Sequence, residues 1–302
     1  MKLAALQALV MAVEEGSLRG AARRLQMSQP ALSKMVRELE LELSAPLLQR
    51  SSRGVEPTAE GKVLYGRALR ACRELDAAVE EIGQLGGQMV GSLHIGAVPL
   101  AVMLLIPEML RTFVPRFPDI RLRISEALYV AQLQQLRTGE MDIIIGGIPD
   151  DLSLGEFHTE PLLTTCMVPA ARLGSAWLAA ASLAELQAAP WVYTGAEFGV
   201  GYARVLYEQH GLSAPPRGAT VNSTLGLLSL VSASDYVALM PQQIVSLPPF
   251  SQQMAVIPVR EQGLPLRVGA ILRPESVLQP LMRQLLAHLH RAAHHIAQQA
   301  AG

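Results

Sequence analysis

In the first sixty residues, segments with apolar residues at helical spacing are separated by residues typical of helix N-caps. This pattern constrains the fold more than any other feature of the sequence. Apolar residues at helical spacing predict a helix over Leu3–Glu14. Ser17 and Ser28 each stand where an N-cap belongs, ahead of two further helical runs. Pro30 falls in the first turn of the last run, where a missing N–H costs little. The pattern therefore predicts three helices, with a tight turn at Gln26-Met27 between the second and the third.

Basic residues gather on this unit, although the whole chain carries a formal net charge of -1. Between Gly16 and Arg37 there are five basic residues and no acidic one. Two helices, a tight turn and a basic exposed second helix predict a helix-turn-helix. The short extended runs over residues 46–57 predict a wing with Arg53 at its tip. On charge alone, a plain helical bundle with a solvated basic face stays open.

This unit resembles the LysR-type transcriptional regulators in residue order and spacing over about sixty residues. The matching residues are Glu14-Glu15-Gly16-Ser17-Leu18, Ala21-Ala22, Leu25, Ser28-Gln29-Pro30-Ala31-Leu32-Ser33, Leu39-Glu40, Pro46-Leu47-Leu48, Arg50 and Pro57-Thr58-Ala59-Glu60-Gly61. Two residues depart from the family pattern under the wing: Ser44 replaces the usual Gly, and Leu48 the usual Phe. Within the family, the chain looks closest to regulators of aromatic-sulfonate and sugar-uptake genes.

The resemblance implies a winged helix-turn-helix DNA-binding domain over residues 1–58. By family analogy and helix geometry, one face of the third helix enters the major groove, and the wing contacts phosphates or the minor groove. The predicted DNA-binding residues are Ser28, Gln29, Pro30, Ser33, Lys34, Arg37, Arg50 and Arg53.

A long linker helix is predicted over residues 59–87, with Thr58 as its N-cap. Its apolar residues alternate spacings of four and three, as in a coiled-coil seam: Leu64, Ala68, Ala71, Leu75, Ala78, Ile82 and Leu85. A single seam needs a partner, which is either the chain's own domain or a second helix. In the family this helix joins two chains, so we expect a dimer through it, and from dimers a tetramer.

From Ser92 onward, strands and helices alternate in two halves of similar size. The predicted strands are Ser92–Val98, Ile120–Glu126, Met141–Gly147, Cys166–Pro169, Trp191–Thr194, Gly218–Val221, Tyr236–Met240 and Leu266–Leu272. Residues 92–302 are thus predicted to form an effector-binding domain, with lobe I over 92–160 and 265–302 and lobe II over 161–264. This region resembles the LysR-type effector domain and a type-2 periplasmic binding protein. The matching motifs are Ile106-Pro107, Phe117-Pro118, Leu136-x-x-Gly139-x-x-Asp142 and Ala238-Leu239-Met240-Pro241. The predicted fold class is multidomain α/β: a winged helix-turn-helix, a linker helix and a two-lobed domain.

No catalytic or cofactor-binding motif survives inspection, so we expect no enzyme activity, no metal and no cofactor. A Gly-x-Ser-x-Gly elbow and a phosphate loop are both missing. The two cysteines are too far apart to suggest a zinc motif. His290 and His294 share a helix face and leave a metal site open, although a solvated helix end is the simpler interpretation. The longest low-charge stretch, Ile95 to Pro107, has thirteen residues, whereas a bilayer needs ~20. We therefore expect a cytoplasmic protein with no membrane association.

Four segments follow predicted strands or begin helices, which is where open α/β folds bind ligands. The predicted effector-binding residues are Val98, Pro99, Leu100, Ala101, Gly147, Ile148, Thr194, Asn222, Ser223 and Thr224. No acidic residue lies in these segments, and helix N-termini attract negative charge, so the effector is predicted to be a small organic anion. Apolar lining from Leu100, Ile148 and Met240 favours a ring or alkyl body.

Three functions stay open at this point. The first is a transcriptional regulator switched by a small effector, with promoter DNA, a second copy of the chain and RNA polymerase as further partners. The second is an enzyme whose α/β catalytic domain is fused to a DNA-binding module. The third is an architectural DNA-binding protein that uses its α/β part to oligomerise.

Overall fold

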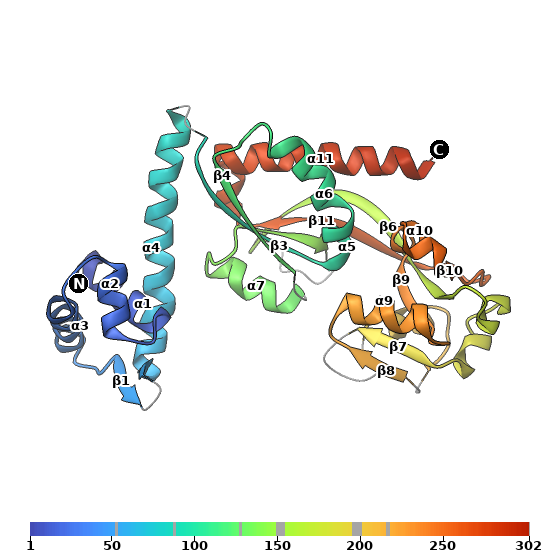
Figure 1. Cartoon of the computed structure of the whole chain (residues 1–302), viewed down its shortest axis with the longest axis horizontal. Coiled ribbons are helices and arrows are strands. Elements are labelled where there is room, and N and C mark those ends of the chain that lie inside the picture. The colour runs from blue at the N-terminus through green and yellow to red at the C-terminus, as the bar shows by residue number, and fades with distance from the viewer. Residues whose placement is uncertain are drawn as a thin grey trace.

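The computed structural model of the chain describes residues 1–51, 54–86, 89–126, 129–148, 155–194, 201–215 and 218–301. A small helical unit, a long helix α4 and a two-lobed α/β domain follow one another along the chain (Figure 1). Within these ranges, no helix is long and apolar enough to cross a membrane.

Three helices build the N-terminal unit, and local capping fixes where they begin. Their bounds are α1 Leu3–Glu14, α2 Leu18–Arg24 and α3 Gln29–Leu43. The backbone N–H of Gly20 donates to the Ser17 hydroxyl over 2.8 Å, and that of Ala31 donates to the Ser28 hydroxyl over 3.3 Å. Both predicted N-caps are therefore confirmed, because each hydroxyl satisfies an N–H that the helix itself leaves free. Gln26 closes the predicted turn with a φ of 54°.

The predicted wing is an antiparallel hairpin of β1 (Leu48–Ser51) and β2 (Gly54–Pro57). Its first strand is held to α3, because a carboxylate oxygen of Glu40 accepts from the N–H groups of Leu47 and Leu48 over 2.8 and 3.1 Å. Gly54 has a φ of +124°, and a β-carbon there would overlap the carbonyl oxygen of Gly16. A glycine is thus required where the wing meets the turn after α1.

Helix α4 (Ala59–Leu85) begins at the predicted cap, Thr58, whose hydroxyl accepts from the N–H of Gly61 over 2.9 Å. The predicted seam divides into two parts. Ala68 is buried and Leu64 half-buried against α1, in the core of the chain's own N-terminal unit. Leu75, Ile82 and Leu85 are 49%, 70% and 74% exposed. Two of the seven seam residues, Leu64 and Ala68, thus pack within the chain, and the other five, from Ala71 to Leu85, are exposed.

The end of α4 also contacts the larger domain. The N–H of Leu281 donates to Gln84 over 3.2 Å, and Glu80 accepts a backbone hydrogen bond from Ser92. Near the middle of α4, a guanidinium nitrogen of Arg73 lies 4.0 Å from a carboxylate oxygen of Glu140. Helix α4 is therefore fixed to the N-terminal unit at one end and to lobe I at the other.

One mixed sheet forms the main layer of the larger domain, in the order β10-β6-β11-β5-β3-β4, with β9 paired to β6. Its strands are β3 Gly91–Ala97, β4 Ile120–Glu126, β5 Ile143–Gly147, β6 His158–Arg172, β9 Ala238–Pro241, β10 Met254–Val256 and β11 Leu264–Leu272. Strands β3, β4 and β5 are parallel, and the β6 and β11 pairings are antiparallel. The carboxyl ends of β3, β4 and β5 therefore share one edge of lobe I.

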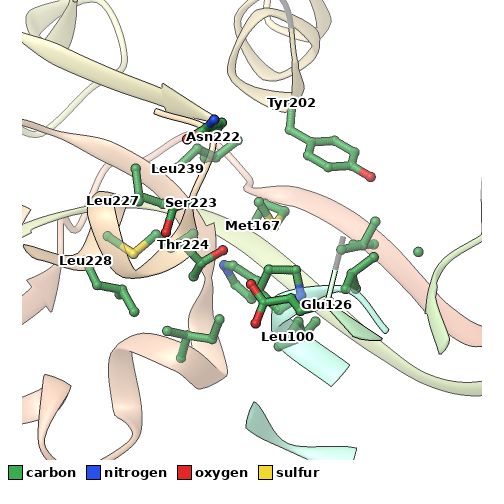
Figure 2. Close-up of a pocket in the computed structure, with 17 residues that line it drawn as sticks. Leu100, Glu126, Met167, Tyr202, Asn222, Ser223, Thr224, Leu227, Leu228 and Leu239 are labelled. Carbon is green, nitrogen blue, oxygen red and sulfur yellow. The ribbon is translucent and has the colours of Figure 1, made fainter. Parts of the chain in front are cut away.

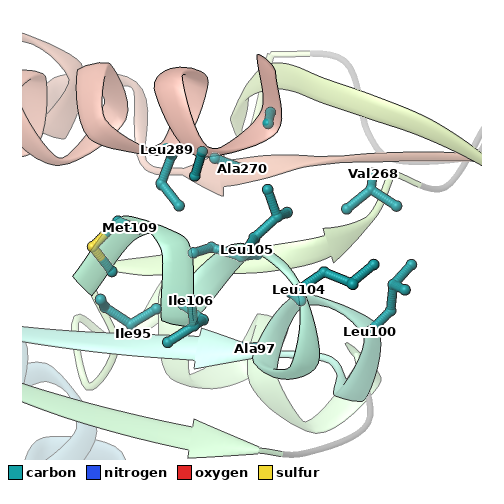
Figure 3. Close-up of a cluster of buried hydrophobic side chains, with 14 of the residues drawn as sticks. Ile95, Ala97, Leu100, Leu104, Leu105, Ile106, Met109, Val268, Ala270 and Leu289 are labelled. Atoms are coloured by element: carbon teal, nitrogen blue, oxygen red, sulfur yellow. The ribbon is translucent and has the colours of Figure 1, made fainter. Parts of the chain in front are cut away.

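The α-helices that the structure describes in lobe I are α5 Pro99–Met103, α6 Leu105–Phe113, α7 Tyr129–Arg137 and α11 Pro280–Ala301. Leu104 separates α5 from α6, and Pro107 lies in the first turn of α6, where its missing N–H breaks no helical hydrogen bond. Side chains of α6 and α11 meet the sheet in a cluster that includes Ile95, Leu105 and Leu289, each at most 1% exposed (Figure 3). This core makes lobe I a rigid base for the loops at its strand ends.

In its described residues, lobe II contains a two-stranded parallel sheet and the α-helices α8, α9 and α10. Its elements are β7 Trp191–Thr194, β8 Gly218–Val221, α8 Tyr202–Gln209, α9 Thr224–Ala233 and α10 Gln242–Ser246. Trp191 is fully buried and donates its indole N–H to the carbonyl of Leu186 over 2.9 Å. The ring of Trp191 packs edge-on against Tyr207, at 5.7 Å between centroids.

Two long paired strands connect the lobes. Strand β6 has fifteen residues, and it crosses the lobe boundary predicted between residues 160 and 161 without a break. It pairs with β11, and the register of this pair shifts between Val268 and Gly269. The lobes are thus joined by a paired β-ribbon rather than by a loose loop.

Candidate DNA-reading surface and effector pocket

Helix α3 separates a buried face from an exposed polar face. Leu32, Val36 and Leu39 are at most 4% exposed. Leu43, which the sequence also places near that apolar stripe, is 42% exposed because it is the last residue of the helix. The opposite face holds most of the predicted DNA-binding residues: Ser28, Gln29, Pro30, Lys34 and Arg37 are exposed, and Ser33 is half-buried. Lys34 is 3.8 Å from Glu38, a solvent-exposed pair that leaves the ammonium free to exchange partners.

The start of α3 adds hydrogen-bond donors to this face. The Ser28 hydroxyl accepts from the N–H of Ala31, while the N–H of Gln29 has no partner within the helix. Arg23 and Arg24, in the last turn of α2, are both exposed. The surface therefore combines positive charge with free N–H groups, which are the groups that contact nucleic-acid phosphates.

Only part of the wing can be compared with its prediction. Arg50 lies in β1, opposite Val55 in the hairpin register, but its side chain lies outside the described residues. Arg53 is itself outside them. The hairpin is in place, and the roles of these two arginines stay predictions.

A pocket of about 290 Å³ lies where the two lobes meet (Figure 2). Seven of the predicted effector-binding residues line it: Val98, Pro99, Leu100, Gly147, Asn222, Ser223 and Thr224. Sheet topology explains the convergence, since β3 and β5 end at the same edge and the start of α9 faces them from lobe II.

Three predicted residues do not belong to this lining. Ala101 is fully buried in the core of lobe I. The N–H of Ile148 donates to the carbonyl of Arg267 over 2.8 Å, and the Ile148 side chain covers Gly269. Thr194 pairs with Val221 between β7 and β8, and its side chain lies outside the described residues.

Other residues of the lining were missed by the sequence reasoning. Among the described residues these are Glu126, Met167, Tyr202, Leu227, Leu228, Leu239, Pro241, Ile244 and Leu266, while Met240 was expected as apolar lining. Glu126 ends a strand whose bounds were predicted correctly, so applying the strand-end rule to β4 would have found it. Tyr202 begins α8, and no local pattern points it toward lobe I.

Most of the pocket wall is apolar, and its polar groups are few. The Ser223 hydroxyl caps α9 by accepting from the N–H of Gly226 over 3.3 Å. Burial raises the pKa of the Tyr202 phenol, which therefore stays protonated and able to donate. Glu126 supplies the pocket's negative charge, and no basic side chain is among the described lining residues.

The histidines of α11 contact other side chains in the described part of the chain. No group of three His, Cys, Asp or Glu side chains is arranged there to hold a metal ion. His290 instead approaches Glu160, with 2.9 Å between its Nε2 and a carboxylate oxygen. His288 is buried, at 4% exposure, and its Nδ1 is 2.7 Å from the Thr112 hydroxyl. It does not lie on a solvated helix face.

Comparison with known proteins gives consistent matches over both parts of the chain. Residues 3–62 match the family model described as a bacterial regulatory helix-turn-helix protein of the lysR family, and residues 86–294 match the LysR substrate binding domain. The HTH-type transcriptional regulator TdcA of Escherichia coli K12 is 28% identical over 252 residues, which cover 82% of this chain and 80% of TdcA. The regulator GbpR of Rhizobium radiobacter is 30% identical, over 79% of this chain and 81% of GbpR.

Solved structures show the same architecture over nearly the whole chain. A full-length OxyR variant from Pseudomonas aeruginosa superposes with a TM-score of 0.71 at 24% identity, covering 97% of this chain and 95% of that one. CbnR, described as a LysR family transcriptional regulator, superposes with a TM-score of 0.67 at 19% identity, covering 97% and 99%. Because the sequence identities are only 19% and 24%, these solved structures show that the fold is shared and nothing more.

Proposed function

Because this chain belongs to the LysR family of transcriptional regulators, we propose that α3 and the wing read promoter DNA while the pocket between the lobes binds the effector. The observation that carries the proposal is the pocket itself, an apolar cavity with a few convergent polar groups. It lies beside the β6–β11 ribbon, so a ligand that contacts both lobes changes their relative orientation.

Gln29, Ser33 and Arg37 follow one another along the α3 face that would lie in the major groove. Gln29, at the start of the helix, can both donate to and accept from an adenine edge. Arg50 and Arg53 are assigned to phosphate or minor-groove contacts from the wing. These contacts would place one reading helix on each half-site of a promoter.

We assign dimerisation of the chain to the exposed residues of the α4 seam. Leu75, Ile82 and Leu85 would be buried against the α4 of a second chain, which places two α3 helices on successive turns of DNA, ~34 Å apart. Two such dimers would make a tetramer, and the bound complex would contact RNA polymerase. A regulator of this kind works in the cytoplasm, where bacterial DNA lies.

The effector is assigned to the pocket as a small organic molecule with an acidic group at the start of α9. The backbone N–H groups at that helix end, together with Asn222 and Thr224, offer donors on the lobe II side. The apolar wall would take an alkyl or ring body. The ligand shifts the open and closed states of the lobes only by its difference in affinity for them.

The experiment is a thermal-shift screen of carboxylates, sulfonates and sugars, followed by calorimetry with each molecule that stabilises the chain. Replacing Thr224→Val removes one hydroxyl from the pocket and is expected to weaken effector binding about 2- to 10-fold. Ser229→Ala is the matched control, because this exposed hydroxyl on the same helix is not part of the lining. Equal affinity of both variants for a confirmed effector would refute the site.

The two remaining functions make different predictions in the same screen. An enzyme would return a bound molecule chemically altered, whereas a regulator returns it unchanged. An architectural protein would gain no stability from any small molecule at any concentration.

A further inference from the structure

The charges around the pocket do not match a simple anion. Glu126 is the one charged side chain among the described residues that line it. In the described part of the chain, no hydrogen bond or ion pair from another side chain holds the Glu126 carboxylate, although its backbone belongs to the β3–β4 ladder. Elsewhere in lobe I, Glu156 pairs with Arg137, and Glu160 with His158 and His290. Glu126 is exposed, so water satisfies its carboxylate in the free protein, and a bound ligand that displaces this water must offer a donor or a positive charge in exchange.

Sheet geometry holds Glu126 at the pocket. It is the last residue of β4, directly beside Ala97 in the parallel register with β3. The β3 chain continues from Ala97 into Val98 and Pro99, which form one wall of the cavity. Thr224 and Asn222 enter from lobe II, and Figure 2 shows these residues and Glu126 around the same space. A ligand bound there meets a negative group from lobe I and neutral donors from lobe II.

We propose that the effector is a small zwitterion, whose acidic group lies at the start of α9 and whose ammonium group binds Glu126. The inference rests on the proposed function, from which it takes the position of the acidic group. It adds the second charge and thereby the chemical class, an amino acid or a similar amino-carboxylic compound with an apolar side chain.

Electrostatics favour this class over the alternatives. A plain anion would lie near the Glu126 carboxylate with no basic side chain in the described lining to offset the repulsion. A neutral polyol could donate to Glu126 but would leave an apolar wall in contact with hydroxyl groups. A zwitterion satisfies the carboxylate and the helix start together, and its alkyl body fits the leucine-rich wall. A volume of about 290 Å³ also suits a small molecule.

Binding would also link the lobes, because the two charged ends of one small molecule contact different lobes. The ammonium end contacts lobe I through Glu126, and the acidic end contacts lobe II at the start of α9. A ligand with only one of these groups contacts one lobe strongly and the other weakly. It should therefore close the cleft less than a zwitterion of the same size.

The test compares probes that share one branched alkyl chain: leucine, 4-methylpentanoate without the amine, and 3-methylbutylamine without the carboxylate. The other apolar amino acids are tested with their deaminated and decarboxylated counterparts, and galactose and benzenesulfonate represent neutral and purely anionic ligands. Each is titrated calorimetrically into the full-length chain, into Glu126→Gln and into Asp119→Asn. Asp119 precedes the other end of β4 and is exposed, so its variant removes the same charge away from the pocket.

We expect at least one zwitterion to bind the wild-type chain at least tenfold more tightly than its single-charge counterparts. Glu126 is exposed to solvent, which limits its contribution. Glu126→Gln should therefore weaken zwitterion binding about tenfold and leave the single-charge carboxylate unchanged or slightly tighter. Asp119→Asn should bind like the wild type, and operator DNA binding without ligand should be equal in all three proteins.

Other results overturn the inference in distinguishable ways. If no zwitterion binds, or if an amine-free acid or galactose binds most tightly, the proposal of a zwitterionic effector is wrong. The pocket remains the effector site as long as Thr224→Val weakens binding of the ligand that does bind. A zwitterion that binds Glu126→Gln as tightly as the wild type also refutes the role of Glu126. If neither Glu126→Gln nor Thr224→Val changes the affinity for a zwitterion, that zwitterion binds elsewhere on the chain. The proposed effector site is then wrong as well.

Discussion

Two glycines in α4 should respond in opposite directions to the same substitution. Gly61 is buried one turn after the start of α4, and a β-carbon there would overlap the carbonyl oxygen of Leu47 and lie 2.9 Å from its carbonyl carbon. Gly66 has no atom within 4 Å of the equivalent position. Helix propensity alone favours alanine over glycine by ~0.5–1 kcal/mol at each site, because both sites lie in a helix. At Gly61, however, the obstacle is backbone, and no side-chain rotation can relieve it.

Gly61→Ala is therefore expected to destabilise the N-terminal unit by about 1–2 kcal/mol, since overpacking costs about 1–3 kcal/mol and the propensity gain offsets only part of it. Gly66→Ala should stabilise the same unit by ~0.5–1 kcal/mol. For a unit of this size, the two melting temperatures should differ by roughly 10 °C. The displaced α4 should also weaken operator binding in Gly61→Ala, because the wing follows Leu47 directly.

The assay is urea or thermal unfolding of the intact chain, followed by far-UV circular dichroism and by tryptophan fluorescence. Both tryptophans, Trp177 and Trp191, lie in the effector domain, so their transition serves as an internal control that neither variant should move. If Gly61→Ala stabilises the helical transition as much as Gly66→Ala does, the close approach of α4 to Leu47 is not a real constraint. If the tryptophan transition of Gly61→Ala shifts together with its helical transition, the substitution also destabilises the effector domain, and its effect is not confined to the N-terminal unit.

Four further results are expected. Gln29→Ala should cost ~1–3 kcal/mol in specific DNA affinity and relax discrimination at one base pair, whereas an equal loss on random DNA would contradict base reading. Ser44→Gly should raise stability by ~1 kcal/mol, because Ser44 ends α3 with a φ of 51°, a conformation that glycine adopts without strain; an unchanged melting temperature would count against it. Leu75→Asp should leave a monomer in sedimentation, and a dimer that persists would show that α4 does not join the chains. Burial raises the pKa of Glu80 above its ordinary 4.5, so its contribution to stability is full below that value and lost as pH rises through the raised pKa; Glu80→Gln should be more stable near neutral pH, and a pH–stability curve parallel to the wild type would refute this.

Local chemistry made the N-terminal unit predictable. A hydroxyl that caps a helix acts within three residues of the chain, so Ser17, Ser28 and Thr58 could be assigned from sequence alone, and all three cap the expected helices. The wing followed from its turn residues and from family resemblance. Ser44 shows the limit of such reasoning, because its departure from glycine was visible in the sequence but its left-handed backbone was not.

Long-range pairing explains what the sequence reasoning missed. Only residues 166–169 of β6 were predicted as a strand, although Pro161, which is unusual inside a central strand, lies within the strand that the structure has. The structure has one strand from His158 to Arg172, and the register shift in β11 lies where it faces Pro161. Glu126 was missed for a different reason. Its strand was correct, but the ligand segments were chosen from the other strand ends.

The attachment of α4 at both ends makes it a lever arm. At ~1.5 Å per residue, its 27 residues span about 40 Å. Arg73, Glu80 and Gln84 anchor the far half on lobe I, and Gly61 fits closely under Leu47 at the near end. A rotation of about 10° at the lobe I anchor would carry the reading helix through ~7 Å, about one-fifth of a ~34 Å turn of DNA. On the proposed function, small angular changes in the effector domain would be amplified into a change of spacing that two adjacent half-sites can distinguish.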